Sequence, residues 1–310
     1  MVHLTSGEHL GSTQRPIVDL PDEERIEWIR AERWISHPAA ETALGVMNDL
    51  LTYPQRSRMP CLLVHGRTGM GKTMILRKFG RDHPPAVDPR LGVAQRPVVL
   101  MQLPPEPSEV PFYEELLGAL GLPLVGEVSR IRARRMARDA LRIVGARILV
   151  IDEIHALLVG GDRQQRVFLN VIRLLANELE LPLVCAGTPE ARRALLTDSG
   201  LADRFESVEL PRWTNNLAFR RLLASYAAIL PLRQRSELDD DMVRTAILKL
   251  TEGITVRIVR LLERLAVEAI RSGVERVTLE SFTKASTPTP LLSMEHLRHA
   301  HNPRRAETTP

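Results

Sequence analysis

Gly66-Arg67-Thr68-Gly69-Met70-Gly71-Lys72-Thr73 is the stretch that decides the fold. It follows a short apolar run, CLLVH at 61–65, and it opens a helical pattern, KTMILRKF at 72–79. A glycine-rich loop that ends in Lys-Thr between a strand and a helix is the P-loop pattern. It predicts a nucleoside triphosphate site, because glycines let backbone N–H groups turn inward around phosphates and the helix N-terminus adds a favourable dipole.

The last two residues of this motif predict the cofactors, ATP and Mg²⁺. Lys72 is expected to neutralise the β- and γ-phosphates, and the Thr73 hydroxyl is expected to ligate the metal ion. No base-reading motif is evident, so the choice of ATP over GTP follows from analogy with the fold alone.

A second motif, RILVIDE at 147–153, is an apolar strand that ends in two carboxylates. Ligands bind at the carboxyl ends of parallel strands, where these side chains would lie. We expect Asp152 to hold the Mg²⁺ shell and Glu153 to orient and deprotonate the attacking water. The residues DEIH at 152–155 also match a helicase box, but helicases need a second domain of comparable size, and a helical segment follows here.

Short apolar runs alternate with helical patterns through the middle of the chain. The strand-like runs are 61–65, 98–103, 147–151, 183–186 and 207–210, and the helical patterns are 72–81, 111–121, 129–144, 162–179 and 189–196. Apolar strands without polar alternation indicate burial on both faces, and their alternation with helices indicates a parallel sheet. We therefore predict an α/β fold: a P-loop AAA+ module with a five-stranded parallel sheet flanked by helices, followed by a small all-helical lid.

The same reading divides the chain into five segments. Strand signals stop after Pro211, and four helical patterns follow it. The predicted segments are a disordered N-terminus (1–20), a helical segment leading into the core (21–55), the AAA+ α/β domain (56–211), the helical lid (212–285) and a flexible tail (286–310).

Three further polar residues fall where an AAA+ protein places catalytic groups. Thr188 ends the strand PLVCAG, where a polar residue senses the γ-phosphate, although most such modules use Asn. Arg204 precedes the fifth strand, from which an arginine can reach the nucleotide of a neighbouring subunit. Arg257 lies near the start of a lid helix, and Arg260, one turn further on, is the alternative.

Composition indicates an ordinary soluble domain, since 44% of the 310 residues are hydrophobic and 26% are charged. No apolar run approaches a membrane span or a secretory signal, so we expect a cytoplasmic protein with no membrane partner.

Cys61 and Cys185 lie in apolar runs and are predicted to be buried without a disulfide or metal. His37, His65 and His155 have no metal-like spacing and are interpreted as structural.

An arginine stripe runs along the helix expected at 129–144. Its members recur every four residues and would share one helix face: Arg130, Arg134, Arg138 and Arg142. Such a face is a candidate for binding DNA phosphates. It is equally typical of a solvated or subunit-contact face.

Five quoted stretches together resemble the TniB family of transposition ATPases, relatives of TnsC-type regulators. They are ERWISHPAAETAL, RMPCLLVHGRTGMGKT, VIDEIHALL, AGTPEARRAL and LADRFESVELPRW with the following helix and ILPLR, within residues 25–285. The resemblance implies a helper that binds double-stranded DNA with little sequence preference and assembles on it as an ATP-dependent ring or helical filament. It further implies that such a protein passes target-site information from a target-selection protein to a DDE-type transposase, with Arg204 acting across a subunit boundary. Arg257 departs from the family pattern, which has a small or acidic residue near that position.

Two other functions share the same nucleotide residues. A helicase loader or replication initiator would often carry a winged-helix domain after the lid, and the tail here is too short for one. A signalling switch that hydrolyses slowly and binds no DNA is the second; Glu153 and the arginine stripe argue against it.

Overall fold

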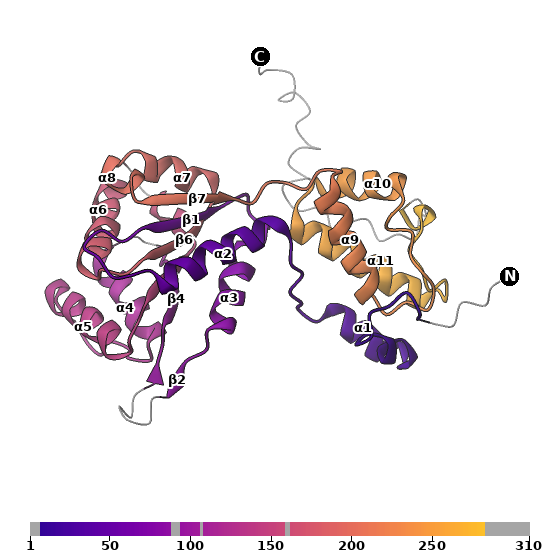
Figure 1. Ribbon diagram of the computed structural model, residues 1–310, viewed down its shortest axis with the longest axis horizontal. Helices are drawn as coiled ribbons and strands as arrows, with labels where there is room; N and C mark the ends of the chain where they lie inside the picture. Colours follow the sequence, from indigo (N-terminus) through magenta and orange to yellow (C-terminus); the bar gives the residue numbers. More distant parts are fainter. Residues whose placement is uncertain (1–6, 88–93, 106–107, 159–161, 283–310) are drawn as a thin grey trace, which may run out of the picture. The chain divides into compact units, whose positions relative to one another are not determined.

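The computed structural model describes residues 7–87, 94–105, 108–158 and 162–282. They divide into two compact units (Figure 1). The α/β unit runs from Ser36 to Arg212, and the helical unit combines the described residues up to Ile35 with those from Trp213 onward. Each unit has its own hydrophobic core. Among the described residues, no helix has the length and apolar character needed to cross a membrane.

A five-stranded parallel sheet forms the centre of the α/β unit. In spatial order its strands are β4 (Val98–Gln102), β5 (Ile148–Asp152), β6 (Leu183–Gly187), β1 (Cys61–His65) and β7 (Phe205–Glu209). β1, β5 and β6 are buried along their whole length, which explains their unbroken apolar sequence. The predicted five-stranded parallel sheet flanked by helices is confirmed.

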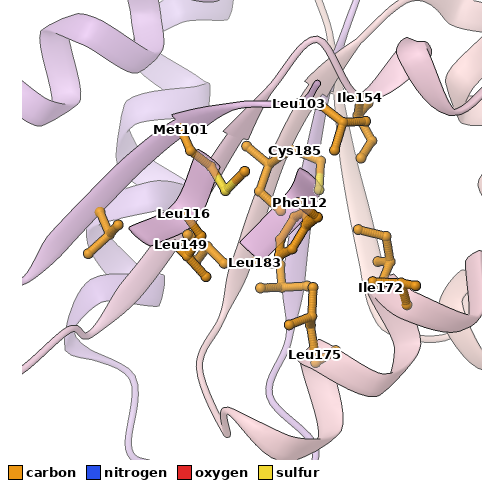
Figure 2. Close-up of a cluster of buried hydrophobic side chains, with 14 of the residues drawn as sticks. Met101, Leu103, Phe112, Leu116, Leu149, Ile154, Ile172, Leu175, Leu183 and Cys185 are labelled. Atoms are coloured by element: carbon orange, nitrogen blue, oxygen red, sulfur yellow. The ribbon is translucent and has the colours of Figure 1, made fainter. Parts of the chain in front are cut away.

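Helices cover both faces of this sheet. They are α2 (Pro38–Thr52), α3 (Lys72–Asp82), α4 (Glu109–Ala119), α5 (Arg130–Ile143), the 3-10 turn η2 (Ile154–Leu158), α6 (Asp162–Glu178), α7 (Pro189–Leu196) and α8 (Ser199–Ala202). Side chains of α4 to α7 form one core with alternate residues of the strands, such as Met101, Leu149 and Cys185 (Figure 2). α2 and α3 pack together, and both contact the sheet. A short antiparallel pair, β2 (Ala86–Val87) and β3 (Ala94–Gln95), stands apart from the main sheet.

The two cysteines are free and buried in the α/β unit, as predicted. Burial raises the pKa of the Cys61 thiol to about 11, and it also raises the pKa of Cys185. Both therefore act as apolar core residues.

The helical unit is built around α11 (Thr255–Arg271). Its other elements are η1 (Arg15–Asp19), α1 (Asp22–Arg30), α9 (Leu217–Ile229), α10 (Asp241–Thr251) and η3 (Leu279–Phe282). α1 packs on α11, so a segment from the N-terminal side completes a core made of later helices. Arg25 of α1 is fully buried; it donates from Nη1 to Glu275 at 2.9 Å and from Nη2 to the carbonyl of Pro231 at 2.8 Å.

The N-terminal residues differ from the expectation. Residues 7–20 were predicted to be disordered, but Leu10 and Val18 are buried and the N–H of Gly11 donates to the carbonyl of Ala228 at 3.1 Å. Two isolated apolar residues gave no periodic signal, yet both are buried. The predicted single segment 21–55 is divided after Ile35, because α1 belongs to the helical unit and α2 to the α/β unit. Residues 1–6 and the predicted tail, 286–310, lie outside the described residues.

Candidate nucleotide-binding site

The P-loop lies where β1 ends and α3 begins. Gly69 and Gly71 have φ angles of 81° and 97°, in the left-handed region that favours glycine. At Gly66 the requirement is the absence of a side chain, because a Cβ there would lie 2.8 Å from the carbonyl oxygen of Leu210. The loop is tied to the sheet by the N–H of Gly66, which donates to the carbonyl of Gly187 at the end of β6 at 3.2 Å.

Lys72, the first residue of α3, points back into this loop. Its ammonium donates to the carbonyls of Gly66 at 2.8 Å and Arg67 at 3.1 Å, and the residue is only 7% exposed. Burial lowers the pKa of Lys72, while the nearby charges of Glu153 and Asp152 act in the opposite direction. The amine is thus held inside a loop whose geometry suits a polyphosphate.

Thr73 and Asp152 meet at the carboxyl end of the sheet. The Thr73 hydroxyl donates to Oδ2 of Asp152 at 2.6 Å, and the N–H of Glu153 donates to Oδ1 of the same carboxylate at 2.8 Å. A hydroxyl beside a single carboxylate fits Mg²⁺, which takes its remaining ligands from water and phosphates. The described residues contain no cluster of three His, Cys, Asp or Glu side chains able to hold a metal alone, so the protein's share of a Mg²⁺ shell would be this pair.

Glu153 has an uncommon backbone conformation and a partner that the sequence analysis missed. Its φ is 58°, in the left-handed region, and its Oε2 lies 3.0 Å from Nε2 of His155. The other ring nitrogen, Nδ1 of His155, is buried without a hydrogen-bond partner. A nitrogen that finds no acceptor is best left unprotonated, which leaves the proton on Nε2 to be donated to Glu153. The spacing of Glu153 and His155 in the sequence DEIH was a signal of this contact, but His155 was interpreted as structural.

Thr188 lies at the same end of the sheet. It follows Gly187, the last residue of β6, and takes the N-cap position of α7. The pKa of Glu190, in the first turn of α7, is lowered first by a backbone hydrogen bond and next by the Thr188 side chain. P-loop, Asp152, Glu153 and Thr188 therefore share the carboxyl end of the sheet.

Arg204 lies at the opposite, amino end. It precedes β7, and its carbonyl accepts from the N–H of Cys61, the first residue of β1, at 2.8 Å. Its Nη2 donates to Oδ1 of Asn177 at 2.5 Å, while its buried Nη1 has no hydrogen-bond partner. Strands of five residues, roughly 15 Å long, separate Arg204 from its own P-loop.

Comparison with known proteins assigns the chain to a family. Residues 25–215, more than half of the chain, match the family described as bacterial TniB protein. The chain belongs to the TniB family. The predicted resemblance is confirmed, while a comparison with curated proteins gave no match.

Solved structures similar to this TniB-family chain have an AAA+ fold. They include Aeropyrum pernix ORC1 in complex with DNA, with 18% identity, TM-score 0.58 and coverage of 83% of this chain and 67% of that one. Cdc6p of Pyrobaculum aerophilum (17%, TM-score 0.58, 84% and 69%) and a Walker-type ATPase of Pyrococcus abyssi (17%, TM-score 0.55, 87% and 77%) are also similar. At such identities the likeness establishes the fold. With this fold, its P-loop and its family, the chain is a nucleotide-binding AAA+ ATPase.

Arg257 of this TniB-family chain belongs to the helical unit. It lies in the first turn of α11, and its Nη1 contacts Oε2 of Glu252 at 2.6 Å. Glu252 itself has a φ of 52°, at the C-cap of α10. The arginine predicted as a nucleotide sensor therefore joins two lid helices.

The arginine stripe of α5 does not form one free basic face. Arg130 pairs with Glu109 of α4 at 3.3 Å, and Arg134 pairs with Glu178 of α6. Arg138 and Arg142, by contrast, line a cavity. The buried side of α5 is formed by Ala133, Ala137, Ala140 and Leu141. Because the four arginines recur every four residues, they lie beside the buried side of α5, where acids of neighbouring helices can reach them.

Proposed function

We propose that the chain binds ATP with Mg²⁺ at the P-loop and hydrolyses it with Glu153 as the general base. The observation that carries this proposal is the 2.6 Å contact between Thr73 and Asp152 beside the buried Lys72, with Glu153 following directly in sequence. Lys72 would neutralise the β- and γ-phosphates, while Thr73 and Asp152 would hold Mg²⁺. Mg²⁺ bound there would supply charge neutralisation on the phosphoryl oxygens.

We assign His155 to the same reaction as a positioning residue. Its Nε2 donates to one carboxylate oxygen of Glu153 and leaves the other oxygen for the attacking water. Thr188, at the neighbouring strand end, is the residue proposed to contact the γ-phosphate or that water. Arg257 is kept as a candidate sensor on the lid side, with its pairing to Glu252 as the contact that nucleotide would compete with.

Self-association supplies the remaining catalytic group. Arg204 lies at the amino end of the sheet and its own P-loop at the carboxyl end, so Arg204 can serve only the nucleotide of another copy. A head-to-tail contact of this kind generates a ring when the rotation closes and a helical filament when it does not. An arginine supplied in trans stabilises charge in the phosphoryl-transfer transition state.

Double-stranded DNA is the proposed platform for this assembly, and a DDE-type transposase with a target-selection protein are the proposed partners. The transposition partners rest on membership of the TniB family. DNA is supported further by two similar structures, Aeropyrum pernix ORC1 and Drosophila ORC, which were solved with DNA bound. Two exposed arginines of α5, Arg132 and Arg135, neither pair with α4 or α6 nor line the cavity that contains Arg138 and Arg142, and they are the proposed phosphate contacts on that helix.

A loader or initiator function is the second candidate, because the fold resembles ORC1 and Cdc6p. The family match favours the transposition helper.

The deciding experiment measures ATP hydrolysis with and without duplex DNA and follows assembly by sedimentation. DNA is expected to raise turnover. Glu153→Gln is expected to lower turnover about 10²–10⁴-fold, the usual contribution of a general base, while nucleotide-dependent assembly on DNA persists. Turnover that ignores DNA, with no oligomer formed, would leave an AAA+ ATPase and remove the support for a transposition helper.

A further inference from the structure

A cavity of about 230 Å³ opens at the amino end of the sheet, away from the nucleotide residues. Its walls come from three places in the sequence: the segment after α2, the C-terminal half of α5 with the turn into β5, and the turn between α6 and β6. Three arginines line it, Arg138, Arg142 and Arg147, with a single acid, Glu180.

The positive charge of this cavity is only partly neutralised by the described part of the chain. Nε of Arg138 is buried without a hydrogen bond, and it forms a long ion pair of 3.7 Å with Asp139. Arg142 is exposed and has no carboxylate partner among the described residues, and Arg147 donates to the carbonyl of Tyr53 at 3.3 Å. Oε2 of Glu180, the one acid that lines the cavity, accepts from the neutral amide of Gln55 at 3.1 Å, and Glu180 forms no ion pair with the three arginines among the described residues.

The same cavity has apolar walls. Tyr53, Leu141 and Pro182 line it beside the arginines. Its volume is below the roughly 300–1,000 Å³ typical of small-molecule sites, so it suits one or two side chains rather than a cofactor. An apolar hollow rimmed by cations is complementary to a ligand that joins an apolar group to several negative charges.

We propose that this cavity is a docking site for an acidic peptide segment of a partner protein. One apolar side chain of that segment would enter the hollow, and its carboxylates would pair with Arg138, Arg142 and Arg147. Arginine suits this role because its planar fork binds carboxylates bidentately. Duplex DNA fits less well, because its phosphates lie on a convex surface and offer nothing apolar to fill the hollow.

The position of the cavity indicates that peptide binding would influence Arg204. A neighbouring cavity of about 280 Å³ shares Tyr53 and Met59 with it and contains Arg204. A peptide seated in the first cavity would therefore lie beside the arginine proposed to act on another copy of the chain.

The test uses the full chain and a fluorescein-labelled octapeptide, Gly-Asp-Glu-Phe-Leu-Glu-Asp-Gly, in fluorescence anisotropy. We expect saturable binding that weakens at least about tenfold in Arg142→Ala and in Arg147→Ala, the loss typical of one charged hydrogen bond. The neutral peptide, with Asn and Gln in place of the acids, should bind at least tenfold more weakly. Arg193→Ala is the control: Arg193 is exposed on α7, where it pairs with Glu190, and does not line the cavity, so its peptide affinity should stay unchanged.

Three outcomes would overturn the proposal. The first is no binding of the acidic peptide, or binding that Arg142→Ala and Arg147→Ala leave intact. The second is displacement of the peptide by duplex DNA together with loss of DNA binding in these two variants, which would assign the cavity to DNA. The third is loss of self-association in both variants by sedimentation, which would assign it to a second copy of the chain.

Discussion

The two ends of the parallel sheet differ in how their polar groups are satisfied. At the carboxyl end, Thr73 bonds to Asp152, Glu153 contacts His155, and the ammonium of Lys72 rests on loop carbonyls. At the amino end, three of the arginines that line the two cavities, Arg142, Arg147 and Arg204, have no carboxylate partner in the described part of the chain.

This difference follows from the polarity of the sheet. All strands of the sheet run in the same direction. The loops that follow the strands carry the motif residues, so these residues lie together at the carboxyl end. The amino end is formed by the segments that lead from the helices back into the strands. At the carboxyl end, the polar side chains of the motifs contact one another or nearby carbonyls. At the amino end, arginines outnumber acids in the two cavities, so this end is complementary to a negatively charged partner, either the nucleotide of another copy or an acidic segment.

The largest expected effect comes from a substitution that changes the amino end of the sheet and leaves the carboxyl end intact. Arg204→Ala should lower ATP turnover by roughly 10³-fold, the lower range for an arginine supplied to a phosphoryl-transfer site. The variant should still bind nucleotide, because its carboxyl end is untouched. Turnover and nucleotide affinity are measured on the same preparation.

Complementation tells whether Arg204 serves another copy. Lys72→Ala removes a phosphate contact but keeps Arg204, so mixing the two inactive variants should restore activity at composite sites. Recovery in the mixture means that the amino end of one chain serves the carboxyl end of another. If the mixture stays as inactive as its components while mixed oligomers form, Arg204 does not act in trans.

The sequence was sufficient for the sheet and the carboxyl end because both are encoded locally. Strands such as CLLVH and RILVID are continuous apolar runs, and the P-loop and Asp152-Glu153 are contiguous with the strands that position them. The contact between Thr73 and Asp152 could be expected, since β1 and β5 lie on either side of β6 and all parallel strands end at the same edge of the sheet.

The amino end could not be predicted because its residues meet only in three dimensions. Tyr53, Arg142 and Pro182 belong to three separate elements and share no motif. The arginine spacing on α5 identified a face, but helical periodicity says nothing about Glu109 and Glu178 on other helices. In the helical unit, likewise, the pairing of Arg25 with Glu275 spans 250 residues, so no local pattern could attach α1 to α11.

A medium effect is expected from Gly66→Ala, which tests the packing of the carboxyl end. The added methyl would lie 2.8 Å from the carbonyl oxygen of Leu210, so we expect a loss of about 1–3 kcal/mol in the free energy of unfolding. Gly45→Ala in α2 is the matched control. No atom lies within 4 Å of its added methyl, and a helical alanine should raise the free energy of unfolding by about 0.5–1 kcal/mol. Chemical denaturation of both variants measures the contrast, and equal effects would contradict the close approach of the loop to Leu210.

The smallest effect concerns the contact that the sequence analysis passed over, between His155 and Glu153. His155→Ala should lower kcat about tenfold, because the loss of one hydrogen bond to a charged group leaves the general base less well oriented. Affinity for ATP should not change, since Lys72 and Thr73 are intact. His155→Gln can still donate to the carboxylate and should recover most of the loss, which separates positioning from a packing defect. A rise in kcat in His155→Ala would reverse the assignment: the 3.0 Å contact would then hold Glu153 away from the attacking water, and His155 would restrain the reaction at this end of the sheet.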